Sequence, residues 1–310
     1  MNILALLTLK AGLTAKEPSC KVLRPSALHL GLFHYSNPLF LKCKKEIMID
    51  HKQWVCGIFD RAASKYGEKS SSFFNYFGKR LVDQVKITPG QKILDVATGK
   101  GAVLFPLAEA VGPQGMVLGV DISQAMLKET TKEVAKRDLH NIKLVWMDAE
   151  HLSFEDNSFD YVCCGFALFF LPSVPAALSE FKRVLKPGGK LVVSIWGEDS
   201  ELDSLINEET QKICHTRTLT ATPLWSGPEL RRVLEQADFN EIQITEETKT
   251  FYHTSFEEWW DSLWSHGIRA KLEQLSSEQV ATLQTQARLR VKPVDFPESL
   301  QVFYGVATKN

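Results

Sequence analysis

The stretch KILDVATGKG, from Lys92 to Gly101, decides the fold of this chain. Its first half is a short apolar run with an acid at Asp95, and its second half is a turn of small residues. The AVLFPLAEAV that follows has apolar residues at helical spacing. We therefore expect a buried strand, a glycine turn and the start of a helix. Glycine lets the backbone approach a ligand closely, and the free N–H groups at a helix start favour a negative group.

The rest of the chain alternates apolar runs with helical patterns. Beyond the first strand, we expect strands at Met116–Val120, Lys143–Met147, Phe159–Phe166, Lys190–Trp196, Ile242–Thr245 and Gln301–Ala307. This rhythm predicts an α/β fold with a doubly wound, mostly parallel seven-stranded sheet. Ligands of such sheets bind at the carboxyl ends of the strands, and Asp95, Asp121 and Asp148 end or closely follow three successive strands.

The composition favours an enzyme that acts on a small molecule. Among 310 residues, 44% are hydrophobic and 24% charged, as in ordinary globular proteins, and the net charge of -1 gives no sign of a nucleic-acid partner. No apolar run reaches the roughly 20 residues that span a bilayer. The six cysteines form no CxxC pair and, with the histidines, no metal-ligand spacing. We expect buried thiols in a reducing compartment, no metal and a cytoplasmic protein.

Residues 1–48 differ from the rest, with scarce acids and scattered prolines. We expect a poorly ordered extension. The alternatives are a transit segment, which would imply an organellar protein, and a true start at Met48. Residues 49–310 form the expected catalytic domain. It divides into an N-terminal helical lid (49–88), a ligand-binding core (89–197) and a C-terminal half (198–310) with a helical insertion at about 255–292.

The lid and the insertion are both rich in aromatic residues. Two amphipathic helices are expected between Asp50 and Val85, with Phe59, Phe73 and Phe74 on their apolar faces. The insertion begins with a helix whose apolar face carries Phe256, Trp259, Trp260 and Trp264. Each face can serve core packing or line a ligand cleft, and the spacing alone does not separate the two.

Four blocks in order now identify a resemblance: ILDVATGKG, VLGVDIS, MDAEHLSFEDNSFDYV and RVLKPGG. The chain from about Phe59 to Trp196 resembles the class I S-adenosylmethionine-dependent methyltransferases, in particular the branch of the ubiquinone and menaquinone C-methyltransferases. The resemblance implies a Rossmann-like methyltransferase fold with an antiparallel last strand beside the sixth. It also implies methyl transfer from S-adenosylmethionine to a small organic acceptor.

The chemistry of S-adenosylmethionine assigns roles to the strand ends. The N–H groups of Gly99 to Gly101 can receive its carboxylate, and Asp121 can accept from both ribose hydroxyls. Ile122 and Ala149 can press on the adenine faces, while Asp148 accepts from the exocyclic amine. By resemblance, Asp95 lies near the amino acid moiety and Gly165 and Phe166 near the methyl group. The remaining predicted cofactor-binding residues are Ala97, Thr98, Met126 and Glu150.

The catalytic assignment is less determined by the sequence. Phe169-Phe170 stands where many relatives carry a histidine after the fourth strand, which removes one candidate base and makes the cleft more apolar. A base is needed only if the acceptor must lose a proton. Our candidates are His253 and Tyr252, followed by His266 and His215.

Two other functions remain open at this point. An NAD-linked oxidoreductase would also have an acid at about the position of Asp121, but Ala97 stands where its fingerprint has the first glycine. A non-catalytic scaffold with a methyltransferase-like fold is the second alternative.

Overall fold

The computed structural model describes residues 51–67, 72–213, 219–222, 224–291 and 295–310. The extension expected at residues 1–48 lies outside these ranges, as does His215. None of the described helices combines the length and the apolar character that a membrane crossing requires.

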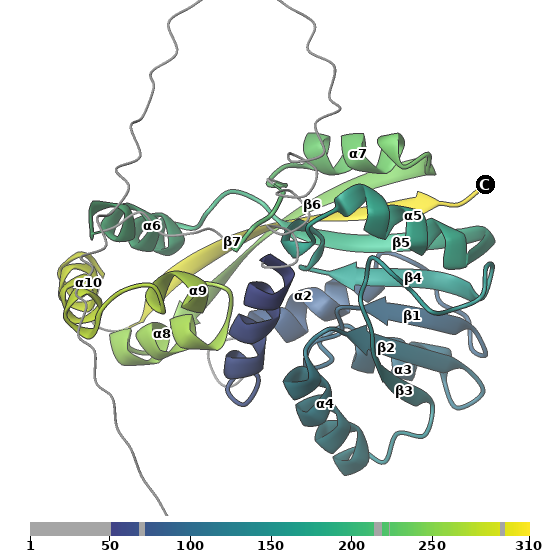
Figure 1. Ribbon diagram of the computed structural model, residues 1–310, viewed down its shortest axis with the longest axis horizontal. Coiled ribbons are helices and arrows are strands. Elements are labelled where there is room, and N and C mark those ends of the chain that lie inside the picture. Colours follow the sequence, from purple (N-terminus) through teal and green to yellow (C-terminus); the bar gives the residue numbers. More distant parts are fainter. Residues whose placement is uncertain (1–50, 68–71, 214–218, 223, 292–294) are drawn as a thin grey trace, which may run out of the picture.

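Seven strands form one sheet in the order β3-β2-β1-β4-β5-β7-β6, which confirms the predicted fold class (Figure 1). β7 is antiparallel to β5 and β6, between which it lies, as the resemblance implied, and β1 to β5 pair in parallel. The strands are β1 (Lys92–Val96), β2 (Met116–Asp121), β3 (Ile142–Trp146), β4 (Phe159–Gly165), β5 (Leu185–Trp196), β6 (Asn240–His253) and β7 (Phe296–Thr308).

The register of the parallel strands brings their carboxyl ends to one edge of the sheet. Asp95 on β1 pairs with Gly119 on β2 and with Cys163 on β4. Asp121, the last residue of β2, pairs with Trp146, the last residue of β3. The acids expected to follow these strands therefore lie near one another.

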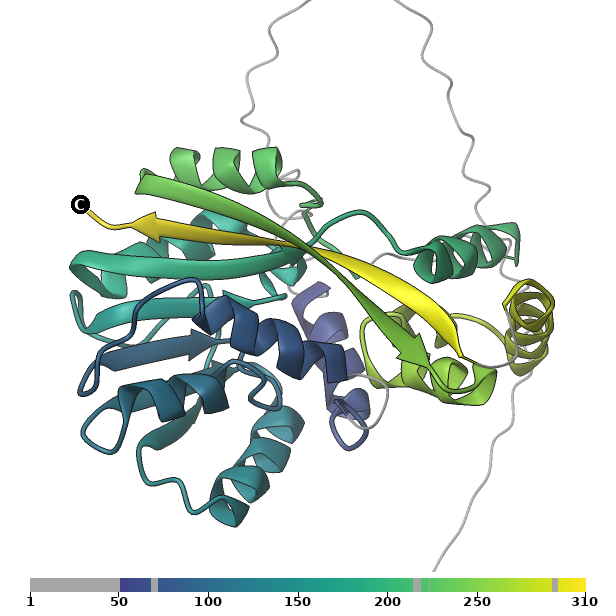
Figure 2. The same ribbon diagram turned by 180° about the vertical axis from the view of Figure 1, so that it is seen from behind.

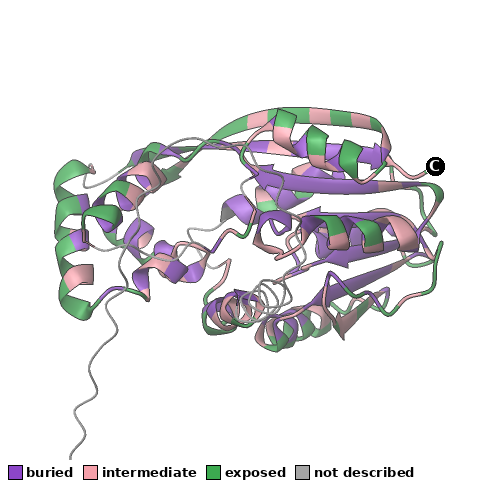
Figure 3. Ribbon diagram, turned by 45° about the horizontal axis from the view of Figure 1, so that its top comes forward, coloured by how far each residue is buried: buried purple, intermediate pink, exposed green. Residues whose placement is uncertain are grey.

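Helices cover both faces of the sheet. α5 lies in front of it in Figure 1, while α2 and α3 lie behind and are seen from the other side in Figure 2. The strands between these layers are mostly buried because they are apolar on both faces (Figure 3). The helices of this part are α2 (Ser72–Val82), α3 (Leu104–Val111), α4 (Gln124–Lys136), the 3₁₀ turn η2 (Leu168–Phe170), α5 (Val174–Val184) and α7 (Gly227–Gln236).

β6 and β7 are much longer than their sequence patterns suggested. They pair along their whole length, from Asn240 with Thr308 to His253 with Phe296. The prediction of a short sixth strand was wrong because β6 is an edge strand with many exposed polar residues, such as those of EETKT. Such a strand lacks the buried apolar run by which an inner strand is recognised.

The end of this long ribbon carries a second group of helices (Figure 2). They bury Phe256, Trp259 and Trp260 in a hydrophobic cluster with Leu202 and Leu283. The group consists of α6 (Glu201–Ile213), α8 (Phe256–Ser262), the 3₁₀ turn η3 (Leu263–Ser265), α9 (Arg269–Leu272) and α10 (Ser277–Arg290). We call it the distal helices.

Candidate functional site

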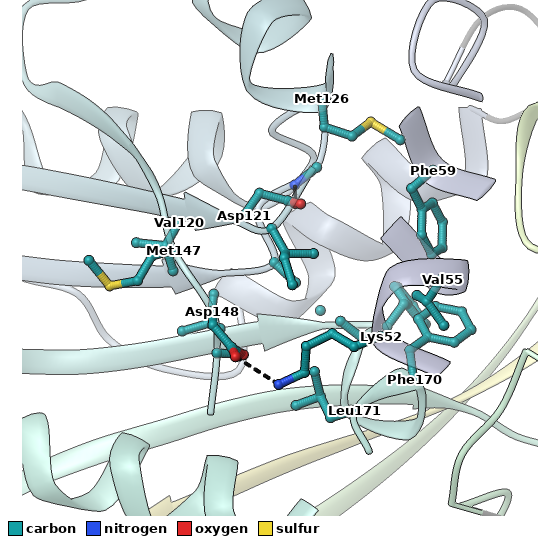
Figure 4. A pocket seen from close by; sticks show the side chains of 18 of the residues that line it. Lys52, Val55, Phe59, Val120, Asp121, Met126, Met147, Asp148, Phe170 and Leu171 are labelled. Atoms are coloured by element: carbon teal, nitrogen blue, oxygen red, sulfur yellow. Dashed lines mark hydrogen bonds and ion pairs between the residues drawn. The ribbon is translucent and has the colours of Figure 1, made fainter. Parts of the chain in front are cut away.

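Two adjoining cavities lie where the carboxyl ends of the strands meet the first described helix, residues 51–62. The strand-end cavity has a volume of about 110 Å³ and is lined by residues that end or follow β1 to β4, among them Ala97, Gly99, Asp121, Ile122, Asp148, Ala149, Gly165 and Phe166, together with Met126 of α4. It is small because Lys52, Val55 and Phe59 of the first helix lie over it (Figure 4).

The aromatic cavity is larger, about 570 Å³, within the range of small-molecule sites. It lies between the first helix, α2, β5, β7 and the distal helices. Its aromatic lining residues are Phe59, Tyr66, Phe73, Phe74, Phe166, Phe169, Phe170, Trp196, Trp225 and Trp259. Since Phe59, Tyr66, Phe166 and Phe170 line both cavities, molecules bound in the two would meet at these rings.

The turn after β1 has an unusual backbone. Ala97, Gly99 and Gly101 all have positive φ, of 55°, 52° and 86°. A Cβ on Gly101 would lie 2.5 Å from the ring of Phe105, so only glycine fits there, whereas a Cβ on Gly99 would meet no protein atom within 4 Å. Ala97, which is not glycine, is therefore a strained residue directly at the cavity.

The N–H groups of this turn are used differently from our prediction. Gly99 N–H donates to Asp121 Oδ2 at 2.8 Å, and Gly101 N–H donates to the carbonyl of Thr98 at 2.9 Å. The expectation that the N–H groups from Gly99 to Gly101 together receive a carboxylate was thus wrong, because two of them already have acceptors within the protein.

Asp121 is fixed by the backbone with both oxygens facing donors. Oδ2 accepts from Gly99, and Oδ1 accepts from the N–H of Ser123 at 2.8 Å. Burial raises the pKa of Asp121 to about 6, although these two N–H groups act in the opposite direction. Each oxygen retains a lone pair, so a ligand with two neighbouring hydroxyl groups could donate to both.

Asp95 does not line either cavity. It is only 1% exposed and accepts a hydrogen bond of 2.6 Å from the hydroxyl of Thr98, also buried. Burial raises the pKa of Asp95 to about 7. The hydrogen bond between Asp95 and Thr98 stabilises the turn within the protein. Neither residue lines the ligand space, contrary to their predicted contact with the cofactor.

Asp148 lines the strand-end cavity but already has a cationic partner. Lys52 Nζ lies 2.7 Å from Asp148 Oδ2 and 2.8 Å from Glu150 Oε2. Burial by itself would raise the pKa of Asp148, but the hydrogen bonds from Lys52 and from the N–H of Glu150 bring it below its ordinary value. Sequence reasoning missed Lys52, which stands 96 residues before its partner.

Glu150, predicted to bind the cofactor, lies outside the cavity lining. Its carboxylate is buried and holds Lys52 through one oxygen, while the other accepts from the N–H of Ser173 at 2.7 Å. Glu150 therefore positions Lys52 and the start of α5 and has no contact with the ligand space.

The first helix is attached to both sides of the site. Asp60 accepts from the hydroxyl of Ser123 at 2.6 Å, beside the strand-end cavity. Arg61 pairs with Glu273, which follows α9 of the distal helices, at 2.5 Å. With the Lys52 contacts, these pairs hold the helix across the two cavities.

Neither lead candidate for a base lines a cavity. Tyr252 is 72% exposed on β6, and the buried His253 bonds Glu298 Oε2 through Nε2 at 2.7 Å. We therefore withdraw both as groups that contact the acceptor. His266, a secondary candidate, does line the aromatic cavity, next to Phe73 and Phe74.

The wall of the aromatic cavity near the distal helices is polar. It includes Asp203, Lys271 and Glu298. Burial, with Glu298 and Asp199 nearby, raises the pKa of Asp203 to about 7, and burial lowers the pKa of Lys271. Among the residues that the structure describes, no cluster of three His, Cys, Asp or Glu side chains could hold a metal ion.

Comparison with known proteins covers the strand-end part of this site. The model of the ubiE/COQ5 methyltransferase family matches residues 47–203, half of the chain. The chain belongs to this family. The aklanonic acid methyltransferase DauC of Streptomyces is 41% identical over 141 residues, which are 46% of this chain and 64% of the relative. The demethylmenaquinone methyltransferase of Staphylococcus saprophyticus is 42% identical over 154 residues, 49% of this chain and 63% of the relative.

Both relatives are thus matched over less than two thirds of their length. The solved structure of the YcgJ protein of Bacillus subtilis shares the fold, with a TM-score of 0.55 at 18% identity over 76% of this chain and 99% of that one. The ubiE/COQ5 match ends at residue 203, inside α6, so it covers the whole strand-end cavity and leaves out most of the distal helices. Membership of this family favours methyl transfer over the NAD-linked alternative.

Proposed function

We propose that the chain transfers a methyl group from S-adenosylmethionine to a small, apolar or aromatic acceptor. The observation that carries this proposal is the pair of adjoining cavities with four shared rings. The strand-end cavity would hold the methyl donor and the aromatic cavity the acceptor, so that the two reacting groups meet beside Phe166 and Phe170.

The residues of the strand-end cavity fit the donor. Asp121 offers an oxygen to each ribose hydroxyl, a charge-assisted pair of hydrogen bonds. Ile122, Met126 and Ala149 supply apolar surface for the adenine. Ligand sites of this kind commonly exceed roughly 300 Å³. The first helix therefore has to open to admit the donor and then close over it, which agrees with the role of a lid.

The protein's contribution to the reaction is positioning in a dry site. S-adenosylmethionine supplies a methyl group on a sulfonium that is already a good leaving group. Phe166, held with positive φ and stacked on Trp196 at 4.0 Å, forms a rigid wall where the cavities meet. Holding two reactants in line can contribute up to about 7–11 kcal/mol, and the aromatic walls exclude water that would compete with the acceptor.

Calorimetric titration tests the donor part of the proposal. We expect S-adenosylhomocysteine to bind and NADH not to bind. Gly99→Val should abolish binding, because its side chain enters the ligand space and not a protein neighbour, while circular dichroism checks the fold under the strain of a positive φ. Binding of NADH alone, or unaltered binding to the variant, would contradict the proposal.

The acceptor is tested by turnover. Extracts and a panel of hydroxylated and carboxylated aromatic compounds are incubated with labelled methyl donor, and methylated products are separated. Transfer to one of them would support an enzyme. Donor binding without transfer to any would favour the non-catalytic scaffold.

A further inference from the structure

We propose that His266 binds the hydroxyl group of the acceptor and takes its proton during methyl transfer. This inference rests on the proposed function, since it assigns a role within the aromatic cavity. In the step, the acceptor O–H bond breaks and its proton goes to a ring nitrogen of His266. The acceptor oxygen forms a bond to the methyl carbon, and the carbon–sulfur bond breaks with its electron pair remaining on sulfur.

The position of His266 places it near the transfer point. Its ring packs edge-to-face against Phe73 and Phe74, with centroids 6.1 and 6.5 Å away. Phe74 in turn contacts Phe166 and stacks on Tyr66, two of the rings that line both cavities. His266 therefore belongs to the group of contacting rings beside which donor and acceptor would meet. A Cβ on the next residue, Gly267, would lie 3.8 Å from the ring of Phe170, which lines both cavities.

The hydrogen-bonding capacity of His266 is free. Its ring makes no hydrogen bond to any residue that the structure describes, although it lines the cavity. Three other polar side chains of the same wall are engaged: Glu298 accepts from Ser200 and bonds His253, Lys271 donates to Asn207, and Gln301 donates to Glu246. A hydroxyl group entering the cavity would thus find an unused acceptor at His266.

The charge state of His266 allows it to accept a hydrogen bond from the acceptor. The pKa of His266 is lowered to about 4, mainly by burial; Glu298 on β7 acts in the opposite direction, and His253 on β6 acts in the same direction as burial. The other charged groups on the cavity lining are Glu198, Asp199, Asp203 and Lys271. At pH 7 the imidazole is therefore neutral and can accept a hydrogen bond, which an imidazolium cannot.

Binding of two matched probes tests the contact without requiring turnover. The full-length protein, saturated with S-adenosylhomocysteine, is titrated with 2-naphthol and with 2-methoxynaphthalene, which lacks the hydroxyl hydrogen. We expect 2-naphthol to bind about fivefold tighter, the value of one hydrogen bond. His266→Phe should abolish this preference and His266→Gln, which keeps an acceptor, should retain part of it.

The controls separate this inference from the proposed function. His140→Phe, the same change at an exposed histidine, should leave the preference unchanged. The affinity of His266→Phe for S-adenosylhomocysteine should stay within twofold of the wild type. If S-adenosylhomocysteine did not bind the wild-type protein, the proposed function itself would be contradicted. No binding of 2-naphthol, or a preference that survives His266→Phe, would overturn the role of His266.

Turnover gives a second measure on any hydroxylated acceptor found by the methyl-transfer screen. There, His266→Phe should lower kcat by at least about 100-fold with a smaller effect on KM. The acidic limb of the wild-type kcat/KM profile should lie below about pH 5 and disappear in this variant. A carboxylate acceptor of the same ring system, already ionised, should be methylated at an unchanged rate; an equal loss with both acceptors would mean a structural role.

Discussion

The two cavities are built in opposite ways. The strand-end cavity takes most of its lining from the ends of successive strands, and its central acid is fixed by backbone N–H groups nearby. The aromatic cavity is assembled from elements far apart in the sequence, from Phe59 to Gln301. The ubiE/COQ5 match covers the whole lining of the first cavity but leaves out the part of the second that follows residue 203. We infer that the members of the family have the first cavity in common, and that the second cavity determines which acceptor this chain binds.

The largest expected effect concerns Asp121. Asp121→Ala removes two charge-assisted hydrogen bonds to the ribose, each worth about 1.5–3 kcal/mol, so binding of S-adenosylhomocysteine should weaken by more than about 100-fold. Binding of 2-naphthol in the aromatic cavity should change little. Calorimetry measures both, and Asp121→Asn, of the same shape, serves as the matched variant. An affinity of Asp121→Ala for S-adenosylhomocysteine within threefold of the wild type would contradict the assignment of donor binding to the strand-end cavity.

A smaller effect is expected where the lid joins the strand ends. Lys52→Met removes the cation that holds Asp148 and the buried Glu150, so the first helix should be less firmly closed. We expect binding of S-adenosylhomocysteine to weaken about fivefold, with a faster dissociation rate in stopped-flow measurements. Lys65→Met, at an exposed position of the same segment, is the control. Equal behaviour of the two variants would mean that the ion pairs do not hold the lid.

The smallest effect on binding is expected at Asp95, where stability should change instead. Its pKa, 3.8 in the unfolded chain, rises to about 7 on folding, so the folded state holds an extra proton between these values. The free energy of unfolding of the unliganded protein should therefore fall as pH rises from about 4 to 7, by on the order of 3 kcal/mol.

Asp95→Asn should remove this slope between pH 6 and 7, where Asp121, with its pKa of about 6, contributes less. The variant keeps an oxygen for the hydroxyl of Thr98. Urea denaturation across this pH range measures the effect, and the exposed Asp138→Asn should leave the slope unchanged. A variant slope equal to that of the wild type would show that Asp95 is not the group responsible.

The sequence was most informative where structure is local. Apolar runs followed by turns predicted β1 to β5, and most residues predicted to bind the donor line one cavity. Asp95, Thr98, Gly101 and Glu150 are the exceptions. Their residue types suit a ligand site, but whether an acid faces the cavity or a neighbouring hydroxyl depends on packing that the sequence does not display.

The aromatic cavity could not be predicted because core and cleft use the same residues. Phe74 and Trp259 have the helical spacing of packing residues, and both do pack, yet they also line the cavity. Lys52 and Glu150, or Arg61 and Glu273, become partners only through the fold, across 98 and 212 residues of chain. For the same reason His266 could not be ranked above His253.

The place of β7 in the sheet has a consequence for the order of folding. Residues 190–196 of β5 pair with residues 302–308, so β5 has no neighbour on that side until the last strand has been synthesised. During translation, Leu191, Val192 and Val193, all fully buried in the folded protein, would lie on an open strand edge, a form prone to pairing with other chains. The closing of the sheet over β5 is thus a late, long-range event, and slow formation of this contact would make the newly made chain dependent on chaperones.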